Sequence, residues 1–225
     1  MKTILFATIM LAACIAAKAQ FTQPGQKVIG GSLGFNSGNN LSTGQPGYES
    51  KGDNFFVSAN AGKFMKKNVL TSVAVSYSNN SAKHISPTNT SNNNSNSVNV
   101  SFGKTYFKEI AKKIYVGLGG FVSMGYGNSV IKNTQSTDRS ESEGYNIGFS
   151  IEPNMSYQLT DRFLLTVAPS ANFLNLNYSY SKISYTQAGQ PGSTGKSQNV
   201  NLNTGFFGSP LSNITVGFRY LLKQK

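Results

Sequence analysis

The chain has 225 residues, with 20 Lys and Arg against 8 Asp and Glu, and its formal net charge is +12. The basic residues form scattered short clusters rather than one stripe with interleaved aromatic residues, so we expect no nucleic-acid partner. The one cysteine, Cys14, lies in a segment that we expect to be removed, which excludes disulfides, thiolate metal sites and a cysteine nucleophile from the mature chain.

Residues 1–19 have the pattern of a cleaved signal peptide. Lys2 gives a basic start, residues 3–15 are nearly all apolar, and Ala17-Lys18-Ala19 supplies a small-x-small cleavage site before Gln20. The apolar run is too short for a membrane helix. In the alternative, residues 11–14 form a lipobox with Cys14 as a lipidated N-terminus. We therefore predict export and a single mature domain, residues 20–225.

The mature chain is divided into segments in which apolar and polar residues alternate, the pattern of strands with one apolar face. The clearest segment is 145–158, where every odd-numbered residue is apolar or aromatic and every even-numbered residue is polar or glycine. The eight predicted strands are 27–36, 54–64, 68–78, 97–107, 114–126, 145–158, 162–180 and 213–222.

The connections between these strands alternate in length. Short turns are predicted at 65–67, 108–113 and 160–161, and long polar loops at 37–53, 79–96, 127–144 and 181–212. Short turns on one side and long loops on the other are typical of outer-membrane barrels, with the turns in the periplasm. The sequence therefore predicts an all-β fold, an eight-stranded antiparallel up-and-down transmembrane β-barrel with both termini periplasmic. A soluble lipocalin-like barrel is the alternative.

The seventh predicted strand changes phase along its length. Residues 163–171 keep the odd positions apolar, whereas Leu174, Leu176 and Tyr178 are even. A β-bulge near residues 172–174 would explain the change. Beyond it, residues up to Leu202 are predicted to form a hairpin above the membrane, with an irregular loop as the alternative.

Aromatic residues gather at two levels of the predicted strands, as in the interfacial girdles of membrane proteins. At the short-turn end they are Phe64, Tyr106, Tyr157, Phe163 and Tyr220, and at the loop end Phe35, Phe55, Tyr77, Tyr126 and Tyr145.

Two charged residues, Glu152 and Arg219, have the parity of the inner face. A charge in a narrow lumen is costly unless it is paired, so we predict an ion pair across the lumen within a structural polar network. A plug or gate formed by the same two residues is the functional alternative.

The turn Ser-Tyr-Gln-Leu-Thr-Asp-Arg-Phe-Leu-Leu (156–165) and the closing Ile-Thr-Val-Gly-Phe-Arg-Tyr (214–220) resemble the small OmpA/OmpX-like outer-membrane β-barrel family. The resemblance implies a Gram-negative outer membrane and a structural, adhesive or narrowly permeable barrel with no common catalytic residue. The chain departs from the family by ending Leu-Leu-Lys-Gln-Lys (221–225) rather than on an aromatic residue, so Tyr220 would serve as the assembly signal.

The predicted polar loops contain few candidate catalytic residues. His84 precedes Ser86 in a His-x-Ser pair, as in lipid A deacylase barrels, but we place it in a solvated loop. The low-complexity stretch 86–97 is predicted to be a mobile surface loop.

We therefore expect a non-enzymatic surface barrel with a structural or adhesive role, without metal or cofactor. A narrow channel for small or hydrophobic solutes is the alternative, and a lipid A-modifying enzyme the remote one. The expected partners are outer-membrane lipids, lipopolysaccharide, the barrel-assembly machinery and extracellular ligands of the loops. Clusters of Lys and Arg at the short-turn rim suit anionic headgroups.

Overall fold

The computed structural model describes residues 23–41, 49–87, 89–133, 138–169, 173–186, 192–203 and 214–222. The predicted signal peptide, with Cys14, and the last three residues of the chain lie outside these ranges. The strands are β1 (Lys27–Leu41), β2 (Glu49–Lys66), β3 (Val69–Ser86), β4 (Asn89–Ala111), β5 (Ile114–Asn133), β6 (Arg139–Gln158), β7 (Phe163–Pro169), β8 (Leu174–Thr186), β9 (Ser193–Asn203) and β10 (Ile214–Leu221).

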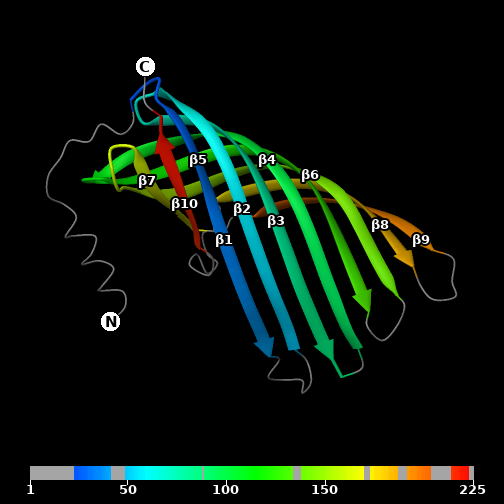
Figure 1. Cartoon of the computed structure of the whole chain (residues 1–225). Coiled ribbons are helices and arrows are strands. Elements are labelled where there is room, and N and C mark those ends of the chain that lie inside the picture. Colours follow the sequence, from blue (N-terminus) through cyan, green and yellow to red (C-terminus); the bar gives the residue numbers. More distant parts are fainter. Residues whose placement is uncertain are drawn as a thin grey trace.

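Eight of these strands close into a ring. Neighbouring strands follow the order β5-β4-β3-β2-β1-β10-β7-β6, and β6 pairs with β5 to complete the circuit. Every pairing in the ring is antiparallel. Figure 1 shows the long strands β1 to β6 side by side and the short β10 next to β1. The predicted eight-stranded antiparallel barrel is thus confirmed.

The remaining two strands extend the wall beyond the ring. β8 continues along β6 past the end of β7, and β9 pairs antiparallel with β8. The predicted hairpin after the seventh strand is therefore confirmed. β10 pairs with β1 only as far as Leu33. From there to Leu41, β1 pairs with β2 alone among the described strands.

The predicted change of phase in the seventh strand has a clear origin in the register. Met155 pairs with Val167 and Ile151 with Leu174, so the chain has three more residues from Val167 to Leu174 than β6 has from Ile151 to Met155. An odd number of extra residues exchanges the two faces of a strand. Leu176 and Tyr178 consequently continue the outer face that Leu165 and Val167 begin.

Three of the predicted long loops are mostly strand, so that part of the prediction is wrong. The stretch 79–96 forms a ladder in which β3 pairs with β4 as far as Ser86 and Asn89. Its Asn and Ser side chains also bond across the strands, with Asn79 Nδ2 donating to Asn96 Oδ1 at 2.8 Å. Backbone pairing does not depend on apolar side chains, so strands continue where the apolar alternation stops.

The same correction applies to the other two stretches and to His84. β1 extends to Leu41 and β2 begins at Glu49, while β5 extends to Asn133 and β6 begins at Arg139. His84 lies in β3 rather than in a loop.

The short turns lie at or beside the predicted positions, although β2 continues to Lys66 and β4 to Ala111. The β2–β3 and β4–β5 turns are two residues long, with Asn68 at φ 65° and Lys113 at φ 66°. This left-handed conformation is common for Asn in tight turns and unusual for Lys.

An apolar core fills the lumen at the short-turn end. Phe64, Leu164 and Leu221 are fully buried there. The other members of the cluster are Val28, Leu70, Phe107 and Tyr115. Phe64 was predicted to belong to an interfacial girdle, and this is wrong: its even number gives it inner-face parity, and its ring lies 6.1 Å from that of Phe107. The barrel is therefore closed by side chains at this end.

The outer face of the ring exposes apolar side chains where the surface of a soluble protein has mainly polar side chains. Large apolar side chains are exposed along β1 to β6, among them Leu33 at 61% and Met124 at 61%. A band of this extent matches the lipid-facing belt of a transmembrane barrel. Among the described residues no helix is long and apolar enough to cross a membrane.

We predict that Phe64→Ala lowers the free energy of unfolding by about 3–5 kcal/mol, because it opens a cavity in the apolar core. Urea unfolding of the barrel in lipid vesicles measures the change. The matched control is Phe102→Ala on the outer face, where the ring is 58% exposed and meets lipid, and its cost is smaller. Equal costs for the two variants would contradict the inner packing.

Candidate functional site: a polar trough above the apolar core

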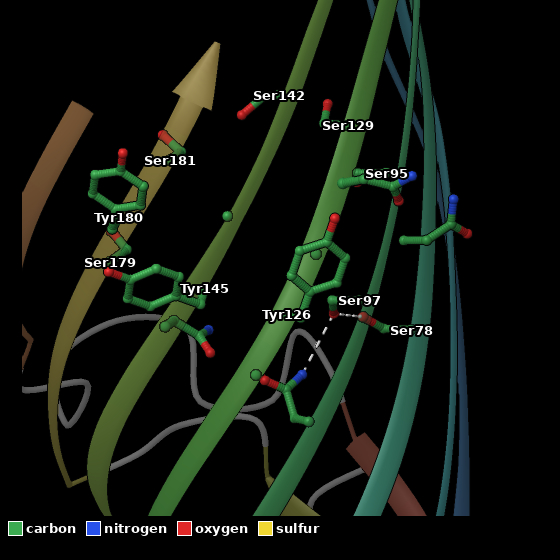
Figure 2. Close-up of a pocket in the computed structure, with 17 residues that line it drawn as sticks. Ser78, Ser95, Ser97, Tyr126, Ser129, Ser142, Tyr145, Ser179, Tyr180 and Ser181 are labelled. Atoms are coloured by element: carbon green, nitrogen blue, oxygen red, sulfur yellow. Dashed lines mark hydrogen bonds between the residues drawn. The ribbon is translucent and has the colours of Figure 1, made fainter. Parts of the chain in front are cut away.

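At the end of the barrel opposite the apolar core, the inner face is hollowed. A cavity of about 280 Å³ opens between β3, β4, β5, β6 and β8, and Figure 2 shows the side chains around it. We call this cavity the trough. The residues that line it are Ser78, Ser95, Asn96, Ser97, Asn99, Gly125, Tyr126, Gly127, Asn128, Ser129, Ser142, Gly144, Tyr145, Asn146, Ser179, Tyr180 and Ser181.

The floor of the trough is a row of small residues that cross the strands in register. Ser97 pairs with Gly127, Gly127 with Gly144, and Gly144 with Ser181. A Cβ on Gly127 would lie 3.0 Å from the carbonyl oxygen of Asn96, so the backbone here leaves little room for a side chain. Large side chains at these positions would fill the lumen, as the side chains of the apolar core do at the short-turn end.

The trough is lined by hydroxyl and amide groups and carries no charged side chain. Ser78 and Ser97 share a hydrogen bond of 2.7 Å, and Asn99 Nδ2 donates to Ser97 Oγ at 3.4 Å. Ser129 Oγ donates to Asn93 Oδ1 at 2.9 Å. Groups of this kind both donate and accept hydrogen bonds, so the arrangement suits an uncharged ligand rich in hydroxyl groups.

Tyrosines frame the trough from the outer side of the same strands. Tyr126 and Tyr145 have outer-face parity and are exposed, and the rings of Tyr145 and Tyr180 stack with centroids 5.2 Å apart. The hydroxyl of Tyr126 donates to Glu143 Oε2 at 3.3 Å.

The residues predicted for the girdles, Phe64 excepted, have side chains on the outer face. The exposed ones include Phe35, Phe55, Tyr77, Tyr106, Tyr157 and Tyr220. Phe163 is partly exposed and stacks on Phe218 with centroids 5.9 Å apart. Their interfacial role stays a prediction.

Glu152 and Arg219 line one small cavity of about 130 Å³ in the middle of the lumen. Glu152 accepts a hydrogen bond from Ser150 Oγ at 2.6 Å, while the Arg219 guanidinium lies 5.3 Å from the centre of the Phe107 ring. Arg219 Nη1 is buried without a hydrogen-bond partner. The ion pairs found among the described residues lie elsewhere, at Lys51–Glu49 and Arg139–Glu141. The structure thus brings both predicted residues to one cavity but gives them different direct partners.

His84 and Ser86, the two members of the His-x-Ser pair, bond to different partners. His84 Nδ1 lies 3.0 Å from Ser50 Oγ on the neighbouring β2, and Ser86 Oγ donates to the Asn89 carbonyl oxygen at 2.9 Å. Among the described residues no group of three or more His, Cys, Asp or Glu is placed to hold a metal ion.

The sequence did not predict the trough, although a signal was present. Inner-face positions at 125, 127 and 144 are all glycine, and their strand neighbours include serine. Small residues at matched inner positions of three or more strands indicate a hollow, but matching requires the register of pairing, which the sequence pattern leaves open.

The solved structures compared below are similar to this chain at low sequence identity. No family model and no curated protein matches the chain. A major outer membrane protein from Thermus thermophilus is similar at 10% identity over 87% of this chain and 99% of the other, with a TM-score of 0.48.

Two small outer-membrane barrels give similar values. The outer membrane protein OprG from Pseudomonas aeruginosa has 11% identity over 91% of this chain and 99% of its own, with a TM-score of 0.45. Neisserial surface protein A has 15% identity over 87% and 96%, with a TM-score of 0.37. The fold assignment depends on the closed ring of strand pairs rather than on these likenesses.

We predict that Glu152 and Arg219 are energetically coupled through their shared cavity. A double-mutant cycle with Glu152→Gln and Arg219→Gln should give a favourable coupling of about 1–2 kcal/mol, because opposite charges attract strongly in a narrow lumen even without direct contact. Urea unfolding in lipid vesicles supplies the four stabilities, and strictly additive losses would show that the two groups act independently.

Proposed function

We propose that the protein is a non-enzymatic outer-membrane β-barrel that presents a polar binding surface outside the cell. In this orientation the short turns and both ends of the mature chain lie in the periplasm, after removal of the signal peptide. The extended strands β3 to β6 and the β8–β9 hairpin then stand on the outer side, with the trough between them. The observation that carries the proposal is the contrast between the closed, apolar end of the lumen and its open, uncharged end.

The closed end supports binding rather than passage. Phe64, Leu164 and Leu221 have no exposed surface, and Phe107 and Tyr115 pack beside them. A solute that crossed the barrel would have to displace this core, at a cost similar to that of opening a packed protein interior. This consideration weighs against the alternative of a narrow channel.

The open end supports a neutral, hydroxyl-rich ligand such as a cell-surface glycan. The trough offers serine hydroxyls and asparagine amides on several strands, which can donate and accept hydrogen bonds with a ligand of this kind. A role in adhesion or in envelope structure follows from such binding. The predicted His-x-Ser pair gives the enzyme alternative no support, because His84 hydrogen-bonds to Ser50 and Ser86 to the Asn89 carbonyl oxygen.

We predict that the wild-type barrel retains one or more neutral glycans on a glycan array, and that filling the trough weakens the binding at least about tenfold. Ser142→Leu and Ser181→Leu place a branched apolar side chain on the trough wall and remove a hydroxyl that the ligand would bond. Binding of fluorescent glycan to the barrel in detergent measures the affinity.

The matched control is Thr194→Leu, an exposed position on β9 that does not line the trough. It should bind as the wild type does, and heat-modifiable gel migration should show that all three variants are folded. Equal glycan affinity in the trough variants and the control, or no glycan binding by the wild type, would refute the proposal.

A further inference from the structure

A row of lysines crosses the outer wall of the barrel near its short-turn end. Lys27 on β1 pairs in register with Lys63 on β2, Lys63 pairs with Thr71 on β3, and Thr71 pairs with Lys104 on β4. All four residues share the parity of exposed apolar neighbours such as Ile29, Val73 and Phe102, so their side chains lie on the outer face. We call these four residues the lysine row.

The lysine row concentrates positive charge, and its lysines form no ion pair with a described residue. Lys27, Lys63 and Lys104 are exposed, and neither ion pair found among the described residues includes any of them. Lys27 stands directly opposite Lys63, and like charges at directly opposed positions of neighbouring strands repel each other. A bound anion would remove this repulsion.

The centre of the row also contains an unpaired polar group. Thr71 lies between Lys63 and Lys104, and its Oγ1 is covered by surrounding atoms and has no hydrogen-bond partner. Strands are about 4.8 Å apart, so the two lysines start about 10 Å from each other and their long side chains can meet over Thr71. One phosphate group would then receive two ammonium groups.

The surroundings of the row favour a lipid as the source of the phosphate. The next cross-strand row away from the turns consists of Ala61, Val73, Phe102 and Val122, all on the outer face. An acyl chain of the lipid would contact this apolar row while the headgroup of the same lipid reached the lysines. Lys104 itself stands between Phe102 and Tyr106 along β4, where a free ammonium group facing lipid would be costly.

We propose that the lysine row binds the phosphate headgroup of an anionic phospholipid in the leaflet at the short-turn end of the barrel. The inference depends on the proposed membrane placement and not on the trough. It assigns a lipid site to residues on the wall, beyond the general attraction of basic turns to a membrane surface.

The test is native mass spectrometry of the full barrel released from nanodiscs that contain equal amounts of phosphatidylglycerol and phosphatidylcholine. The wild type should retain phosphatidylglycerol preferentially. The double variant Lys63→Gln with Lys104→Gln should lose that preference by about 30-fold, as expected for two lysines near a membrane surface.

The chain offers a closely matched control. Lys83 on β3 and Lys132 on β5 are exposed lysines of the outer face. Both pair with Asn92 on β4, at the end of the barrel opposite the short turns. The variant Lys83→Gln with Lys132→Gln removes the same charge and should keep the preference for phosphatidylglycerol.

Equal lipid retention by the wild type and the Lys63/Lys104 variant would overturn the proposal, as would an equal loss in the control. Displacement of the lipid by excess inorganic phosphate would also overturn it, because the site would then recognise free phosphate. Glycan binding, measured on the same samples, separates this result from the trough: it should be unchanged in both lysine variants.

Discussion

The narrow lumen of an eight-stranded ring is the constraint on which the rest of the structure depends. Such a ring encloses only enough space for its own inward side chains, so the size of those side chains decides where the barrel is solid and where it is hollow. At the short-turn end Phe64, Phe107 and Leu164 fill it completely. At the other end Gly127 and Gly144 leave the trough open. The closed ring therefore contains a packed plug, and the wall that continues beyond it contains the open trough.

Strand parity joins this inner pattern to the outer one. Each inward residue has outward neighbours along its strand, so the glycines and serines of the trough alternate with exposed tyrosine, methionine and valine. The seventh strand keeps this relation only because three extra residues separate Val167 from Leu174 relative to β6. Without them, Leu176 and Tyr178 would point into the polar trough and Asn175 and Asn177 toward lipid.

Much of the wall follows from the sequence because alternation of apolar and polar residues is a local signal. It predicted eight strands, the short turns and the phase change near Leu174. It failed in 79–96, where Asn and Ser on both faces give no alternation although the backbone ladder continues to Ser86 and Asn89. Phe64 was misplaced for a different reason: its aromatic character suggested an interface, although its parity indicated the core. The trough and the lysine row depend on which residues of neighbouring strands lie opposite each other. The alternation within a single strand does not determine this register.

The central claim is that the barrel is sealed at its short-turn end by the apolar core around Phe64 and open at the other. Single-channel recording in planar lipid bilayers tests this most directly. The inserted wild-type protein should show no discrete conductance steps over the voltage range that the bilayer tolerates, because ions cannot cross the core without unpacking it. Reproducible, discrete openings of the wild-type barrel would contradict the seal and favour the channel.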